Sequence, residues 1–219
     1  MSTLRLAWKT WCETRARFAL CAAALLIAPL AGGLRGPIAQ VWPRAYGESI
    51  ATLFVLLVVT LGGGSLRQER ALGTLGFTLA LPVSRARLVV VRAATGVAQV
   101  ALLVLSVAAL LAALAPWGVG TALTMAARWA AFGALLLALS TLMSSVFESD
   151  YVAWLGAFLA FLGYEALVNL SALRAHPGLD LYRFLGVGGL AATPPWAMLA
   201  ALLAATALFV AASVRAARW

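Results

Sequence analysis

Long, almost uninterrupted apolar stretches constrain the fold of this chain more than any other feature. The 219 residues are 64% hydrophobic and only 11% charged, whereas soluble domains carry about 25% charged residues. A globule of this size cannot hide so much apolar surface, so lipid must surround much of the chain. The stretches are continuous and rich in Ala and Leu rather than alternating, which favours transmembrane helices over a β-barrel.

Six stretches are apolar enough to form transmembrane helices of about 20 residues. They cover residues 18–34, 48–65, 88–114, 125–147, 152–170 and 196–214. Arg92 and Arg128 fall near the ends of their predicted spans, where we expect the side chains to reach the membrane interface. The sequence therefore predicts one all-α, polytopic transmembrane domain over residues 1–219, with six transmembrane helices.

The distribution of basic residues predicts the orientation of these spans, because Lys and Arg accumulate in cytoplasmic loops. With the N-terminus inside, all but five of the 16 Lys and Arg residues fall on the inner side. The five on the outer side are Arg35, Arg44, Arg128, Arg174 and Arg183. We therefore expect both termini to be cytoplasmic.

Residues 2–17 have the pattern of an amphipathic helix, with apolar and charged side chains recurring at helical spacing on opposite faces. The apolar face carries Leu4, Ala7, Trp8, Trp11 and Phe18, and the polar face carries Arg5, Lys9, Glu13 and Arg17. Arg15 is an exception on the apolar side. We expect this helix to lie in the membrane interface, with Trp at headgroup depth, either as a simple anchor or as a contact for a partner.

Residues 67–88 are the one long segment with regularly placed polar residues between two apolar stretches. Leucines recur at helical spacing from Glu69 onward, Pro82 can end that helix, and Ser84 can cap the next one. The pattern predicts a short cytoplasmic helix over residues 69–81. An ordinary polar loop with a chance apolar stripe is the alternative.

Two features are predicted on the outer side. Residues 171–195 are half apolar and contain Gly and Pro clusters, which suits a re-entrant hairpin or a short surface helix. Glu165 is the one acid well inside a predicted span, and Tyr164 and Asn169 lie close to it. An intramembrane acid is a candidate substrate contact or outer gate. The alternative is an ion pair with an outer arginine.

The polar segment resembles part of the ABC-2 type ABC transporter permeases, in which the pattern "E…GTL…LPVSR" recurs. Here it runs through Glu69, Gly73–Thr74–Leu75 and Leu81–Pro82–Val83–Ser84–Arg85, although Gly76–Phe77 stands where an acidic residue often follows. In that family an amphipathic N-terminal helix precedes six spans, and the segment after the second span is a coupling helix that sits on the nucleotide-binding subunit. The resemblance implies an ATPase contact through Glu69, Leu72, Gly73, Thr74, Leu75, Pro82 and Arg85.

By this resemblance the chain is the membrane-spanning permease subunit of an ATP-driven exporter in the bacterial cytoplasmic (inner) membrane. A separately encoded ABC ATPase would bind ATP and Mg, and two permeases would pair as a homodimer or heterodimer. The chain has a single lysine, Lys9, with no glycine-rich loop before it, so we expect no nucleotide site, no catalytic residue and no cofactor in this chain. The apolar composition favours an amphipathic or lipid-like substrate.

Other interpretations remain open. Length and span number also resemble the haem-exporter B subunit of cytochrome c maturation, and an ATP-independent carrier or membrane scaffold would have the same hydropathy. Cys12, Cys21 and His176 do not have the spacing of metal ligands, so we expect no metal site. Arginines at membrane edges account for the net charge of +9, so we expect no nucleic-acid partner.

Overall fold

The computed structural model describes residues 3–33, 48–62, 73, 84–114, 119–147, 149–168, 184–185 and 196–216, and no strand occurs among them. The helices with described bounds are α1 (Thr3–Gly33), α3 (Glu48–Leu61), α6 (Arg85–Leu114), α7 (Val119–Val146), α8 (Asp150–Val168) and α11 (Trp196–Ala216). Each coincides with a predicted span to within a few residues, with two exceptions. α7 begins six residues before residue 125, and α1 begins at Thr3 and so also includes the predicted interfacial helix.

Three stretches in these helices are long and apolar enough to cross a membrane. They are Ala86–Leu110 in α6, Val119–Val146 in α7 and Leu199–Ala216 in α11. The apolar parts of α3 and α8 are shorter, at Thr52–Leu61 and Tyr151–Leu167. The prediction of an all-helical membrane protein is confirmed for the described residues, while the count of six spans stays a prediction.

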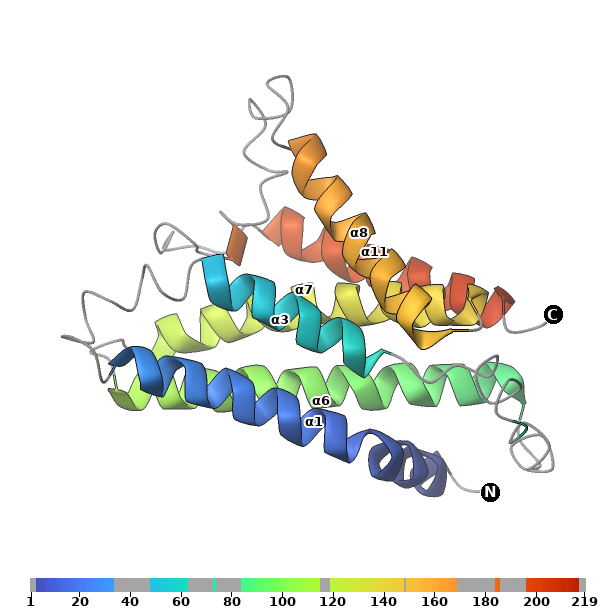
Figure 1. Cartoon of the computed structure of the whole chain (residues 1–219), viewed down its shortest axis with the longest axis horizontal. Helices are drawn as coiled ribbons and strands as arrows, with labels where there is room; N and C mark the ends of the chain where they lie inside the picture. The colour runs from blue at the N-terminus through green and yellow to red at the C-terminus, as the bar shows by residue number, and fades with distance from the viewer. Residues whose placement is uncertain are drawn as a thin grey trace.

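The helices lie side by side and alternate in direction along the chain. Figure 1 shows α1 and α6 beginning, and α7 and α11 ending, at the same end of the bundle, on the right in that view. The end of α3 points towards the same end. Both boundaries of the segment between α3 and α6 therefore face one end of the bundle, together with the first turns of α1.

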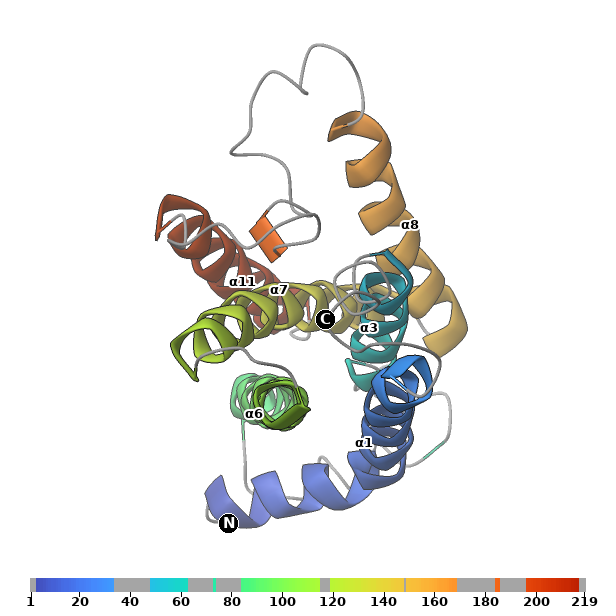
Figure 2. The same ribbon diagram turned by 90° about the vertical axis from the view of Figure 1, so that its left-hand side faces the viewer.

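α7 is the central helix and packs against α11, α6, α8 and α3, as Figure 2 shows. It meets α6 through a reciprocal pair of glycines. A Cβ atom on Gly133 of α7 would lie 2.5 Å from Val100 Cγ1, and one on Gly96 of α6 would lie 2.7 Å from Leu137 Cδ1. Each glycine thus receives a side chain of the other helix, the kind of close approach that small residues allow in membrane helices.

The predicted interfacial helix and the first predicted span form one continuous but bent helix. The first part of α1 runs across the bundle, and the rest runs along it (Figure 2). The hydroxyls of Thr10 and Thr14 donate to the carbonyl oxygens of Leu6 and Thr10, at 3.0 and 2.9 Å. Hydroxyl bonds to the carbonyl four residues earlier favour bending of a helix.

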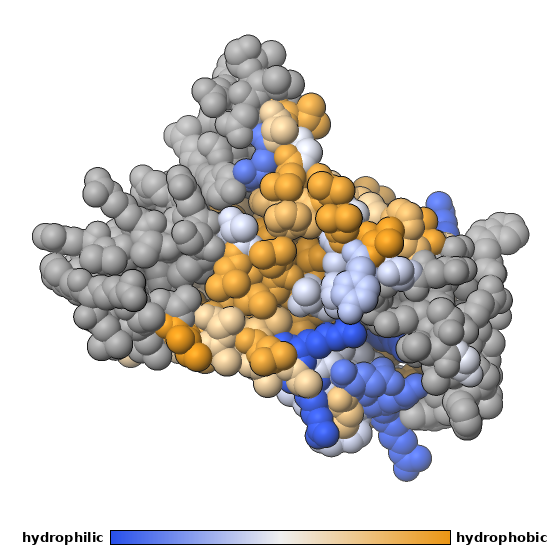
Figure 3. Space-filling view, viewed as in Figure 1, coloured by the Kyte–Doolittle hydropathy of each residue, from blue (hydrophilic) through white to orange (hydrophobic). Residues whose placement is uncertain are grey.

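The surface is apolar over much of the bundle. Leu155 of α8 is 57% exposed and Leu208 of α11 is 69% exposed, as expected for side chains that face lipid. Figure 3 shows hydrophobic side chains across the middle of one face and hydrophilic ones gathered over the first turns of α1. The described exposed charges there belong to Arg5, Glu13 and Arg15.

Candidate functional site

The predicted ATPase contact lies between α3 and α6. Of its interior the structure describes Gly73 alone, which is exposed, has a φ of 71°, and has nothing within 4 Å of a built Cβ. At this φ the backbone forms a turn that Gly adopts without strain. Arg85 begins α6. The other predicted contact residues lie outside the described residues, namely Glu69, Leu72, Thr74, Leu75 and Pro82, as does the rest of the predicted helix 69–81.

The last turn of α3 is held by side chains from α7. The final carbonyls of a helix have no partners within the helix and need them from elsewhere. Ser140 Oγ donates to the carbonyl oxygen of Val59 at 2.7 Å, and Ser144 Oγ donates to that of Gly62 at 3.4 Å. Gly62 is also packed closely, because a Cβ there would lie 2.6 Å from Ser140 Cβ. The point where the chain leaves α3 is therefore fixed against α7.

α1 holds the same helix end from another direction. Arg17 Nη1 donates to the carbonyl oxygen of Thr60 at 3.5 Å, and its guanidinium carbon lies 5.5 Å from the centre of the Trp154 ring of α8. A cation at the C-terminus of a helix is favourable because the helix dipole is negative there. Arg17 thus joins α1, α3 and α8 at the end of the bundle that carries the predicted contact.

The start of α6 has the cap that the sequence predicts. The backbone nitrogen of Arg87 donates to Ser84 Oγ at 3.3 Å, and that of Leu88 donates to the Ser84 carbonyl oxygen at 3.1 Å. Ser84 Oγ therefore caps one of the unpaired amides at this helix end, and the Ser84 carbonyl accepts the first bond within the helix. The side chain of Arg87 also donates to the hydroxyl of Thr3 in α1.

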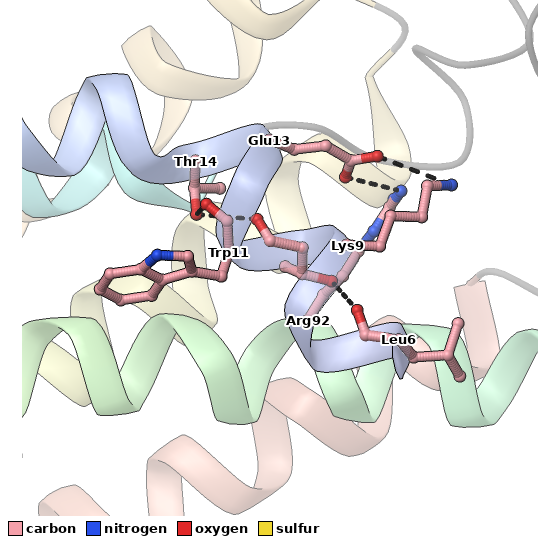
Figure 4. A network of polar contacts seen from close by, with 7 residues as sticks. Leu6, Lys9, Trp11, Glu13, Thr14 and Arg92 are labelled. Atoms are coloured by element: carbon pink, nitrogen blue, oxygen red, sulfur yellow. Dashed lines mark hydrogen bonds and ion pairs between the residues drawn. The ribbon is translucent and has the colours of Figure 1, made fainter. Parts of the chain in front are cut away.

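The first turns of α1 are fastened along α6 by further contacts (Figure 4). The Glu13 carboxylate lies 3.6 Å from Lys9 Nζ and 3.9 Å from Arg92 Nη2. Gln99 Nε2 donates to Thr14 Oγ1 at 2.6 Å. α1 therefore touches both flanks of the predicted contact segment, the end of α3 and the start of α6.

α1 has two apolar sides, of which the sequence pattern identified one. Leu4 is 82% exposed and Trp8 is 68% exposed, so these two residues of the predicted apolar stripe face away from the protein. Phe18 of the same stripe is half-buried and packs against the main apolar core. Leu6 is only 2% exposed and packs with Leu88 and Val91 of α6. One side of this helix thus packs on the protein, and the other is free to enter the headgroup layer.

The predicted outer site is described in part. Tyr164 and Glu165 lie in the last turn of α8 and are both half-buried, and Tyr164 packs against the main apolar core. Asn169 lies outside the described residues. The convergence of these three side chains on a substrate path or gate therefore stays a prediction.

One residue differs from its expected placement. We expected Arg128 to reach the membrane interface, but its side chain is 1% exposed and lies within α7. Its neighbour Trp129 is half-buried beside it. The expectation rested on the position of Arg128 near the end of a predicted span. Hydropathy does not show towards which neighbouring element a side chain points, so the burial of Arg128 could not be predicted from it.

The described residues contain no group of three or more His, Cys, Asp and Glu side chains that could hold a metal. Cys12 and Cys21 are both free thiols. His176 lies outside the described part of the chain. The sequence matches no protein-family model and no curated protein.

Proposed function

We propose that this chain is the membrane-spanning permease subunit of an ATP-driven exporter of the ABC-2 type. In this proposal the segment between α3 and α6 docks a separately encoded ABC ATPase, which carries ATP and Mg. The observation that supports it most is the anchoring of both flanks of that segment. Side chains of α7 and α1 bind the last carbonyls of α3, and Arg87 in the first turn of α6 binds the Thr3 hydroxyl of α1.

Firm flanks suit a segment that passes force from a partner to the membrane helices. If the flanks were flexible, a displacement of the segment would stay local. Because the flanks are bonded to neighbouring helices, a displacement of the segment should move those helices as one body. ATP binding would draw two ATPase subunits together and tilt α3 and α6 with them, carrying α1 along. The chain itself supplies no phosphate-binding loop, since its single lysine is Lys9.

The substrate path in this proposal lies between two permease copies in the cytoplasmic membrane of a bacterium, as a homodimer or a heterodimer. The exposed side chains of α8 and α11 are largely apolar, including Leu155 and Leu208. An apolar path of this kind suits an amphipathic or lipid-like substrate. The half-buried Glu165 would supply a polar contact along it.

Co-purification with an ABC ATPase encoded next to this chain tests the proposal. Gly73→Glu places a long charged side chain on the exposed turn, and we expect it to abolish association. Gly73→Asn is the matched control, because Asn adopts a positive φ more readily than most residues and adds no charge. Gly120→Glu is a second control, since Gly120 is exposed, has nothing within 4 Å of a built Cβ, and begins α7 at the other end of the bundle.

We expect both controls to retain the ATPase. Association that survives Gly73→Glu as well as it survives Gly120→Glu would contradict the docking proposal. It would place the ATPase contact on another surface of the chain. Absence of any association in the unchanged protein would favour an ATP-independent carrier or a membrane scaffold instead.

A further inference from the structure

A fully buried arginine lies inside the central helix. Arg128 is 1% exposed and is among the largest completely buried side chains of the described residues. It lies nine residues after Val119, the first residue of α7, which corresponds to about 14 Å along a helix axis. The surrounding stretch is long and apolar enough to cross a membrane. A cation at such a position is costly unless its charge is compensated, and it marks a functional role by default.

The described partners of Arg128 belong to a distant part of the chain. Arg128 Nη1 donates to the carbonyl oxygen of Phe184 at 3.2 Å, and Trp129 Nε1 donates to that of Leu185 at 3.3 Å. The guanidinium carbon also lies 6.0 Å from the centre of the Phe184 ring, within the range of a cation–π contact. Two consecutive donors of α7 thus meet two consecutive carbonyls 56 residues further along.

These contacts occur in the apolar interior. Phe184 is 3% exposed and Leu185 is 2% exposed, and both belong to the main core cluster. Figures 1 and 2 show the pair as a short orange-red ribbon beside the bundle helices, between α8 and α11 in the chain. Residues 184 and 185 are both helical, and each of their carbonyl oxygens accepts a side-chain donor of α7.

Trp129 also connects the contact to another helix. Its ring meets the Phe54 ring of α3 edge-on, with centroids 5.0 Å apart and an interplanar angle of 83°. The indole N–H is therefore held in position by packing that does not involve Leu185. A substitution that keeps an aromatic ring at residue 129 can remove the hydrogen bond and leave most of this packing in place.

We propose that Arg128 and Trp129 are positioning residues that clasp the backbone of Phe184 and Leu185 against α7. The charge of Arg128 serves this clasp, which fixes where the chain between α8 and α11 enters the bundle. The proposal does not depend on the ATPase partner, because it concerns contacts within the chain at the other end of α7.

The test measures how readily a thiol at residue 185 reacts in the full-length protein in lipid nanodiscs. Cys12→Ser and Cys21→Ala remove the native thiols, and Leu185→Cys introduces one under the clasp. We expect N-ethylmaleimide to label this thiol slowly when Arg128 is present and at least 10-fold faster with Arg128→Met. Arg128→Lys keeps a charge and a donor, and we expect it to restore slow labelling in part.

A thiol placed elsewhere in the core separates local release from general loosening. Ala153 of α8 is 0% exposed, so Ala153→Cys in the same background reports on the bundle as a whole. We expect Arg128→Met to leave its labelling rate unchanged. If Arg128→Met also speeds the labelling of residue 153, the labelling rate of residue 185 is measured instead in Trp129→Phe. This variant loses the donor to Leu185 but keeps an aromatic ring against Phe54. Unchanged labelling of residue 185 with Trp129→Phe, or with a folded Arg128→Met protein, would overturn the proposal.

Discussion

Gln99 Nε2 donates a hydrogen bond of 2.6 Å to the hydroxyl oxygen of Thr14, and so joins α6 to the bent part of α1 across 85 positions of sequence. Gln99 is 0% exposed. Its amide oxygen is buried and has no hydrogen-bond partner among the described residues. The Thr14 hydroxyl in turn donates to the carbonyl oxygen of Thr10. The Gln99 side chain is therefore linked through Thr14 to the backbone of α1.

Unequal costs are predicted for removing the two partners of this bond. Thr14→Val leaves the buried amide of Gln99 without its acceptor, which should lower the free energy of unfolding by about 1–3 kcal/mol. Gln99→Leu removes both the donor and the buried oxygen that lacks a described partner, so its cost should be under about 1 kcal/mol. Denaturant unfolding of both single variants and the double variant measures this. A Gln99→Leu protein as unstable as Thr14→Val would contradict the assignment.

The Glu13 ion pairs should contribute little to stability. The Glu13 side chain is 45% exposed and the Lys9 side chain is 38% exposed, so solvent screens their charges. We expect Glu13→Gln to change the free energy of unfolding by less than about 1 kcal/mol. The difference between the two proteins should shrink further as salt is raised. A loss of several kcal/mol that persists at high salt would show that Glu13 has another partner in the folded protein.

Opposite signs are predicted for two Gly→Ala substitutions. A methyl group at Gly133 would meet Val100 Cγ1 at 2.5 Å and Phe54 Cζ at 2.9 Å, so overpacking should cost about 1–3 kcal/mol. A methyl group at Gly163 of α8 meets nothing within 4 Å, and Ala is the better helix former. Thermal unfolding in detergent should therefore show a lower midpoint for Gly133→Ala and an equal or higher one for Gly163→Ala. Equal destabilisation of both would contradict the close contact of α6 and α7.

Loosening the end of α3 should impair coupling without releasing the ATPase. Ser140→Ala removes the 2.7 Å bond to the Val59 carbonyl, at a cost of about 1 kcal/mol. The proposed contact surface is unchanged, so the ATPase should still co-purify. We expect the effect of the permease on the ATPase rate in reconstituted vesicles to fall several-fold. Ser106→Ala is the matched control, since Ser106 is exposed and, among the described residues, its hydroxyl bonds within its own helix, to the Leu102 carbonyl at 2.8 Å.

Helix type and approximate position could be predicted from the sequence because long apolar stretches leave few alternatives. The cap at Ser84 was also predictable, since capping depends on residues adjacent in sequence. The pairing of Thr14 with Gln99 was not, because helical periodicity shows which residues share a face but not which helix that face meets. Arg128 was placed wrongly for the same reason. Its described partner is a backbone carbonyl oxygen. Every residue has one, so residue types do not indicate which carbonyl will be the partner.

Val100 of α6 packs against Gly133 of α7, and Leu137 of α7 packs against Gly96 of α6. These two contacts restrict how α6 can move relative to α7. Sliding either helix along the other by one residue would bring a side chain against a neighbour that has a Cβ atom. Translation between the two helices is therefore blocked in both directions, and they should travel together. A displacement of α6 near its first residue, Arg85, should therefore displace α7 as well.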